Sequence, residues 1–168
     1  GLEMIEAKWL FGLEYDQIDV IIHPQSIIHS LVQFEDGSLK AQMGLPDMKL
    51  PIQYALTYPK RFENNFKRVN FLDYPNLTFE QPDMEVFRNL KLAFQALEAG
   101  GNAACVLNGA NEIVVEAFLN DRVGFLQMSE IIEETLCQVK SQKTLSLEDY
   151  LQFDLESRTV ARSLIERI

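Results

Sequence analysis

Two kinds of pattern are missing from this sequence of 168 residues, and both absences restrict where it can work. It has no run of about 18 or more apolar residues, so we predict no membrane span. Its two cysteines, Cys105 and Cys137, belong to no CxxC pair and lie in apolar, helix-like sequence. We therefore expect two buried thiols and a reducing compartment such as the cytoplasm.

Positive charge is also scarce. The chain has 15 Lys and Arg against 25 Asp and Glu, a net charge of -10. Proteins that bind nucleic acids need a basic face to replace the counterions of the phosphates. The densest basic patch here is only Lys60, Arg61, Lys67 and Arg68. We therefore predict no nucleic-acid partner.

Motifs of self-sufficient nucleotide enzymes are absent as well. The sequence contains no GxGxxG between a strand and a helix, no P-loop lysine and no GxSxG elbow. An independent dehydrogenase or kinase is therefore not supported. The chain also begins at Gly1 with no good helix cap ahead of a helical pattern, which favours a cut through something longer.

The first region, residues 1–58, mixes helix and strand patterns. Helical spacing of the apolar residues predicts one amphipathic helix at the start, carried by Leu2, Ile5, Trp9 and Leu10. A short apolar run at residues 18–22 predicts a strand. Residues 27–34 and 39–43 flank Asp36-Gly37, and Asp-Gly between β-favouring runs predicts a hairpin. A short helix is expected at residues 52–56.

The rest of the chain divides into a linker and a helical region. Residues 59–83 contain Pro59, Pro75 and Pro82, which prevent long regular elements. Residues 84–168 carry four apolar stripes at helical spacing, which predict a four-helix bundle. We expect the second helix to be entered at residues 108–112, because Asn caps well, and the fourth near Asp154. The expected fold class is α+β.

Two acidic residues and one turn could take part in chemistry. Glu3 and Glu6 lie three apart and share a helix face, where acids in a first turn most often only favour the positive helix end. The alternative is that one carboxylate binds a hard divalent cation, which wants oxygen ligands. Residues 23–30 hold both histidines and two hydroxyls where a strand ends, a place where catalytic groups concentrate. The alternative is that one histidine bonds the backbone at the turn and the other packs in the hairpin.

Four blocks of the sequence resemble the 1-deoxy-D-xylulose 5-phosphate reductoisomerase family. They occur in the order of that family, and the resemblance covers essentially the whole chain. The blocks are GLEMIEAKWLF at residues 1–11, IHPQSIIHS at 22–30, GLPDM at 44–48 and LNGANE at 107–112. Each block alone is modest, but together they are highly specific.

The resemblance implies an enzyme that converts 1-deoxy-D-xylulose 5-phosphate to 2-C-methyl-D-erythritol 4-phosphate in the non-mevalonate route to isoprenoids. It implies NADPH and Mg²⁺ or Mn²⁺ as cofactors, with the metal polarising substrate oxygens. It also implies a homodimer formed through the central domain. Residues 1–58 would then be the end of a catalytic domain with its dimerisation strands, 59–83 a linker and 84–168 the C-terminal bundle.

The resemblance also implies roles for single residues. Glu3 matches a metal ligand that also contacts substrate, and Glu6 a second catalytic acid on the same helix face. Ser26 matches a substrate-contacting hydroxyl, and His29 a histidine that lines the catalytic pocket. Pro46 and Met48 match residues that pack near the nicotinamide. No catalytic role is implied for Glu112.

Several parts of the family pattern are missing from this chain. They are the dinucleotide-binding domain, the other two metal ligands, the phosphate-binding residues and the mobile loop over the substrate. We therefore expect no turnover by this chain alone. The alternative is a helical binding or scaffold module with a β-hairpin dimerisation arm, which would explain the bundle and the acidic surface but not the four ordered blocks.

Overall fold

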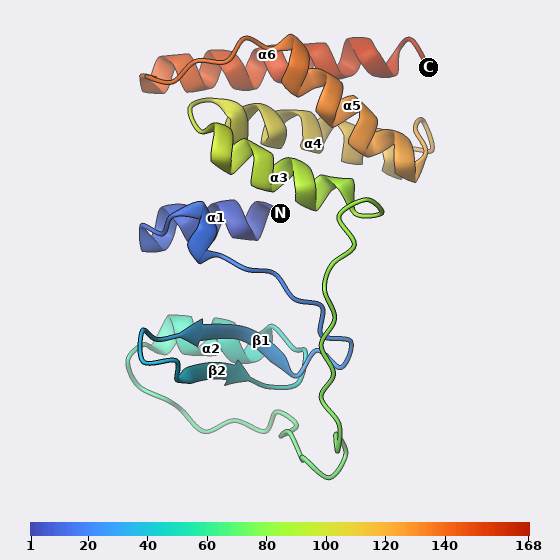
Figure 1. The fold of residues 1–168 in the computed structure, drawn as a ribbon. Helices are drawn as coiled ribbons and strands as arrows, with labels where there is room; N and C mark the ends of the chain where they lie inside the picture. Colours follow the sequence, from blue (N-terminus) through green and yellow to red (C-terminus); the bar gives the residue numbers. More distant parts are fainter. The chain divides into compact units, whose positions relative to one another are not determined.

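The computed structural model describes residues 1–168 and divides into two compact units, each considered by itself (Figure 1). The helical unit comprises Gly1–Asp19 and Asp83–Ile168, and the hairpin unit comprises Val20–Pro82. The only sheet has two antiparallel strands, so the described chain contains no parallel dinucleotide-binding sheet. The α+β class with a hairpin and a C-terminal bundle is confirmed.

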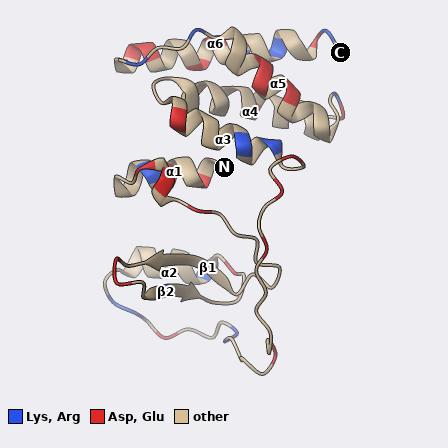
Figure 2. Ribbon diagram, in the orientation of Figure 1, with Lys and Arg blue, Asp and Glu red and all other residues tan.

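Four helices form the bundle: α3 (Arg88–Ala99), α4 (Ala103–Leu119), α5 (Phe125–Gln138) and α6 (Leu147–Ile165). Helix α4 packs against α3, α5 and α6 and is buried along most of its length. Its neighbours supply the facing apolar side chains, among them Leu92, Leu97, Ile131, Ile132, Phe153 and Ile165. Figure 2 shows acidic residues on α3, α5 and α6 and basic residues on α3 and α6.

Two helix starts differ from those expected. Residues 108–112 lie inside α4, which begins at Ala103, so the expectation of a helix entry there was wrong. Helix α6 begins at Leu147, well before Asp154, because Ser146 and Asp149 form a capping box. The Ser146 Oγ accepts from the Asp149 N–H at 3.2 Å. Leu151 is exposed, so the first turns of α6 carry no buried stripe that would reveal them.

Asn102 ties the start of α4 to the connection between α5 and α6. This side chain is 2% exposed, and its Nδ2 donates to the Lys140 carbonyl at 2.9 Å. Its Oδ1 accepts from the Gln142 N–H, and its own N–H donates to the Gln142 carbonyl, both at 3.0 Å. The buried amide is therefore fully paired, as burial of a polar group requires.

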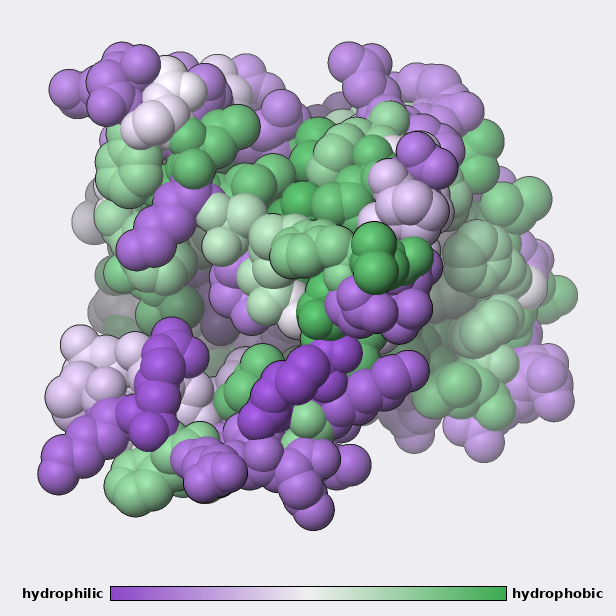
Figure 3. Space-filling model, turned by 90° about the horizontal axis from the view of Figure 1, so that it is seen from below, coloured by the Kyte–Doolittle hydropathy of each residue, from purple (hydrophilic) through white to green (hydrophobic).

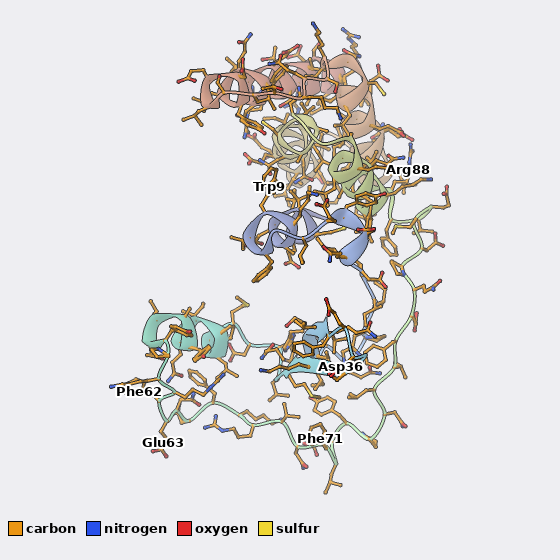
Figure 4. The ribbon with its side chains drawn as sticks, turned by 60° about the vertical axis from the view of Figure 1, so that its left-hand side comes forward. Trp9, Asp36, Phe62, Glu63, Phe71 and Arg88 are labelled. Carbon is orange, nitrogen blue, oxygen red and sulfur yellow. The ribbon has the colours of Figure 1, made fainter.

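The first helix, α1 (Leu2–Phe11), is confirmed and belongs to the helical unit. Its start packs on α3, where a Cβ at Gly1 would lie 2.8 Å from the Ala93 Cβ. Met4 is the one buried side chain of α1. Trp9 at its other end is 69% exposed and stands clear of the helix in Figure 4.

The hairpin unit is built on β1 (Ile28–Gln33), which pairs antiparallel with β2 (Leu39–Met43). The predicted hairpin is confirmed, and Gly37 adopts a φ of 84° in its turn. The Asp36 carboxylate accepts from the Ser38 N–H at 2.9 Å and from its hydroxyl at 2.6 Å. The short helix α2 (Lys49–Thr57) follows, longer than expected.

The strand expected at residues 18–22 does not form, so that prediction was wrong. Only Ile22 makes a β-bridge, to Glu80 of the predicted linker. The apolar run is interrupted by Asp19 and has no second strand beside it. The linker itself contains no helix or strand apart from this bridge, and it carries Phe62 and Phe71 along its course (Figure 4).

Contacts divide the chain at places other than the domain boundaries expected from the sequence. Residues 1–19 pack with the bundle, and residues 59–82 belong to the hairpin unit. The domains were assigned from sequence patterns and a family resemblance and the units from contacts, so the domain boundaries stay a prediction. No helix is long and apolar enough to cross a membrane.

Candidate active site

Glu3 and Glu6 lie on the exposed side of α1. Both side chains are exposed, and neither makes a hydrogen bond or an ion pair within the chain. Being three residues apart, they share one helix face. No group of three or more His, Cys, Asp or Glu side chains gathers anywhere in residues 1–168 as a metal ion would need. The helical unit thus presents two free carboxylates but no complete metal site.

Ser26 closes a tight turn in the hairpin unit. Its N–H donates to the His23 carbonyl at 3.0 Å, and Pro24 and Gln25 occupy the corner. Ser26 has a φ of 49°, in the left-handed region that costs a residue with a Cβ about 1–2 kcal/mol. Its side chain is exposed and its hydroxyl makes no hydrogen bond within the chain. The hydroxyl is therefore free to contact a ligand.

His29 joins two of the sequence blocks that carried the resemblance. Its Nε2 lies 3.1 Å from the carbonyl oxygen of Gly44, the first residue of the GLPDM block. The Gly44 N–H in turn donates to the carbonyl of Ile27 at 2.9 Å. A carbonyl only accepts, so this bond places the proton on Nε2 of His29 and leaves Nδ1 free. The ring is exposed and can therefore serve a ligand through Nδ1.

Pro46 and Met48 lie in the loop that enters α2. Asp47 fixes this loop, because its Oδ1 accepts from the Lys49 N–H at 2.9 Å. Pro46 and Met48 are exposed, and Met48 retains 69% of its surface. An exposed, flexible thioether beside a proline is suited to packing against a flat ring.

The LNGANE block has a packing role in the bundle. A Cβ at Gly109 would lie 2.2 Å from the Ser157 Oγ, so only glycine lets α6 approach α4 here. Glu112 pairs with Arg158 at 2.8 Å, and Arg158 also donates to Asp154 at 2.7 Å. The hydrogen bond from Arg158 holds the pKa of Glu112 below its usual range.

The two cysteines differ in environment. Cys105 is half-buried; burial raises the pKa of its thiol, which donates to the Tyr150 carbonyl at 3.5 Å. Cys137 lies on the outer face of α5 and is exposed. The expectation of two buried thiols was therefore wrong, because Cys137 is exposed and Cys105 is only half-buried.

Comparison with known proteins decides the family. The protein-family model for the DXP reductoisomerase C-terminal domain matches residues 43–160. A 1-deoxy-D-xylulose 5-phosphate reductoisomerase from Bacteroides fragilis is 56% identical over 165 residues, covering 98% of this chain and 42% of that protein. The chain belongs to the DXP reductoisomerase family. It spans less than half of the length of this curated relative.

Solved reductoisomerases have the same fold over nearly the whole chain. The enzyme from Zymomonas mobilis in complex with NADPH has a TM-score of 0.90 and 42% identity, over 98% of this chain and 44% of that one. A DOX-P reductoisomerase in complex with NADPH, fosmidomycin and magnesium has a TM-score of 0.88 and 40% identity, over 98% and 43%. The recognised resemblance is therefore confirmed.

The structure groups the predicted site residues in two sets. Ser26, His29, Pro46 and Met48 belong to the hairpin unit, and hydrogen bonds connect the segments that carry them. Glu3 and Glu6 belong to the helical unit. Each set is defined within its own unit.

Two features of the chain were missed by sequence reasoning. Gln25 pairs with Thr78, which is 53 residues away, and no local pattern signals that partner. A cavity of about 540 Å³ lies beside α2, lined by Tyr54, Arg61, Phe66 and Lys67 among others. The Arg61 guanidinium lies 4.0 Å from the Tyr54 ring centroid. The cluster of basic residues at 60–68 was the one signal of this cavity in the sequence.

Proposed function

We propose that this chain forms part of an NADPH- and divalent-metal-dependent reductoisomerase. Its reaction converts 1-deoxy-D-xylulose 5-phosphate to 2-C-methyl-D-erythritol 4-phosphate in non-mevalonate isoprenoid biosynthesis. The observation that carries this proposal is the 56% identity to a reductoisomerase across 165 of the 168 residues. Chance likeness of a single motif does not explain such coverage.

In this proposal the hairpin unit holds part of the substrate. The free hydroxyl of Ser26 donates to or accepts from a substrate oxygen. The Nε2 of His29 is bonded to the Gly44 carbonyl, so the ring presents Nδ1 to the substrate. Because that hydrogen bond fixes the tautomer, Nδ1 of neutral His29 accepts a proton or a hydrogen bond from a substrate hydroxyl.

A Mg²⁺ or Mn²⁺ ion would be held only in part by this chain. Such ions bind one or two carboxylates together with substrate oxygens and water. Glu3 is the proposed ligand and Glu6 a nearby catalytic acid, but the described residues form no cluster of three donors. The remaining ligands belong, in this proposal, to the portion of the relatives that the chain does not span. The bound metal supplies Lewis-acid polarisation of substrate oxygens.

NADPH would be contacted at its nicotinamide end only. Pro46 and Met48 offer exposed apolar surface for a flat ring, and they help to exclude water from the reduced carbon. Neither residue can hold the charged diphosphate. When bound, the cofactor would supply the hydride for the reduction.

The decisive test is NADPH oxidation in the presence of Mg²⁺ and 1-deoxy-D-xylulose 5-phosphate. We expect turnover by the full-length natural protein that contains this sequence and none by residues 1–168 alone. In the full-length protein, Glu3→Gln should lower kcat/KM by about 100-fold or more, because it removes a metal ligand. Glu98→Gln, at an exposed partnerless acid on α3, is the matched control and should leave the rate unchanged.

Failure of the full-length protein to oxidise NADPH would refute the function. Turnover by the isolated chain would refute only its proposed dependence on missing parts. We also propose a cytoplasmic homodimer that acts without nucleic acid or membrane partners. The two-stranded sheet leaves strand edges unpaired within the chain, and such edges invite pairing with another strand. No observation favours the alternative of a scaffold module.

A further inference from the structure

The turn that contains Ser26 is held against the linker by a set of hydrogen bonds, and no sequence motif predicts them. Gln25 Oε1 accepts from the Thr78 N–H at 3.0 Å, and Gln25 Nε2 lies 2.8 Å from the Thr78 hydroxyl oxygen. His23 Nδ1 donates to the Thr78 carbonyl at 2.9 Å. We call this set, formed by His23, Gln25 and Thr78, the clasp. It uses the backbone donor, the backbone acceptor and the hydroxyl of one threonine.

Neighbouring contacts extend the clasp along the linker to Phe79 and Glu80. The His23 ring stacks on Phe79, with centroids 4.8 Å apart and planes 21° from parallel. Ile22 and Glu80 exchange both backbone hydrogen bonds, at 2.9 and 3.0 Å. The linker segment 78–80 is therefore held against residues 22–25 at four successive points.

Ser26 is held from the other side as well. The next residue, Ile27, is fully buried, and its carbonyl accepts from Gly44. Ser26 thus lies between two anchored residues, Gln25 and Ile27, in a left-handed conformation that a serine rarely adopts. Such a conformation persists when its surroundings over-determine it. Its own side chain contributes nothing to the anchoring and remains available.

We propose that Gln25 and Thr78 are positioning residues, which aim the Ser26 hydroxyl at the substrate by fixing the turn through the linker. This inference rests on the proposed substrate contact of Ser26. It also gives a functional reason for the path of the linker, which brings Thr78 to the Ser26 turn. Without the clasp the turn relaxes toward ordinary backbone angles, and the Ser26 Oγ swings away from its binding direction.

The test uses steady-state kinetics of the full-length natural protein with Mg²⁺. Gln25→Met keeps the length of the side chain but removes its donor and its acceptor. We expect KM for 1-deoxy-D-xylulose 5-phosphate to rise about tenfold, the loss of one well-placed hydrogen bond. KM for NADPH should stay within about twofold, because Ser26 does not contact the cofactor in this proposal. Gln152→Met, at an exposed glutamine on α6, is the matched control and should change neither value.

A double-mutant cycle separates positioning from general damage. In a Ser26→Ala background the clasp has no hydroxyl left to aim, so Gln25→Met should raise the substrate KM by less than about twofold further. Thr78→Val should raise the substrate KM, because it removes the hydroxyl. Thr78→Ser keeps the hydroxyl and should retain wild-type kinetics. If Gln25→Met does not fold, Thr78→Val carries the test, because it removes the hydroxyl and keeps both backbone contacts.

Three results would overturn the inference. They are an unchanged substrate KM in the folded Gln25 variant, an equal rise in the Ser26→Ala background, and a parallel rise of both KM values. A wild-type protein that does not turn over this substrate overturns the proposed function instead. The two failures are therefore distinguishable.

Discussion

The helical unit and the hairpin unit maintain their folds by different means. Most of the buried apolar side chains lie in the helical unit, spread over α1 and the four helices of the bundle. In the hairpin unit Ile27 is the single buried apolar side chain, and Val32, Phe34, Leu39 and Ile52 are at least half exposed. Exposed apolar residues of this kind appear as green areas in Figure 3. Hydrogen bonds and turns, not a core, define the shape of the hairpin unit.

The sequence blocks of the two units differ in the same way. The LNGANE block in the bundle serves packing through Gly109 and an ion pair through Glu112. The IHPQSIIHS and GLPDM blocks in the hairpin unit present free side chains from anchored turns. The bundle block is therefore explained by packing within the chain, whereas the exposed side chains of the hairpin-unit blocks are the ones for which we propose a ligand contact.

The strongest challenge to this comparison is Ile27→Ala. Truncation of a fully buried isoleucine typically costs about 2–5 kcal/mol, and the hairpin unit has no second buried apolar side chain to compensate. We expect amides of residues 20–82 to lose protection from hydrogen exchange, measured by mass spectrometry, while those of 83–168 keep theirs. The matched bundle variant, Ile132→Ala, should lower stability by a similar amount and leave the bundle folded. Equal loss of protection in both units would contradict the comparison.

Gly109→Ala tests the close approach of α4 and α6. The added Cβ would meet the Ser157 Oγ, and such overpacking costs about 2 kcal/mol. Urea denaturation followed by circular dichroism should show the loss. Ser157→Ala removes the obstructing oxygen and should recover part of it in the double variant. If Gly109→Ala proved as stable as wild type, the close approach would not constrain the sequence.

A smaller effect is expected at the start of α6. Ser146→Ala removes the side-chain acceptor of the capping box and should lower the unfolding free energy by about 1 kcal/mol. Ser146→Thr keeps a hydroxyl and serves as the control. Urea midpoints of the three proteins decide the matter, and identical midpoints would mean that the cap does not hold the helix start.

The smallest effect concerns the pH dependence of stability in the helical unit. Hydrogen bonds from Arg158 lower the pKa of Glu112 from 4.5, and those from Ser146 lower the pKa of Asp149 from 3.8. A lowered folded pKa gives stability that is present above the unfolded pKa and is lost as pH falls through the folded value. Both side chains are largely exposed, so solvent weakens the effect. Thermal melts from pH 6 to pH 3 should show a smaller decline for Glu112→Gln than for wild type.

Local patterns predicted part of this structure, and distant partners set the rest. Asp36-Gly37 predicted the hairpin, because the residues that determine a tight turn lie within four positions of one another. The apolar stripes predicted the bundle, because the spacing of apolar residues along a helix is also a local pattern. The true start of α4 depends on Asn102, whose side chain bonds residues 140–142, and no local signal reveals that. The start of α6 had a local signal in its capping box, but its exposed first turns concealed it.

The candidate site divides in the same manner. The residue types at Glu3, Ser26 and His29 attracted attention, but spacing alone gave them no assigned role. Their assignments came from resemblance to a family. The clasp was invisible for a physical reason, since Gln25 and Thr78 meet across 53 residues of chain. Cys137 was misjudged because helical spacing does not tell which face of α5 meets solvent.

The helical unit is discontinuous in sequence, since the hairpin unit enters it between Asp19 and Asp83. Contacts within the bundle are local and can form quickly, whereas α1 must find α3 across the whole insertion. The cost of closing a loop grows only slowly with its length, so a long insertion is tolerated at this point. Docking of α1 is therefore expected as a late step of folding. It would bring Glu3 and Glu6 onto an already formed scaffold.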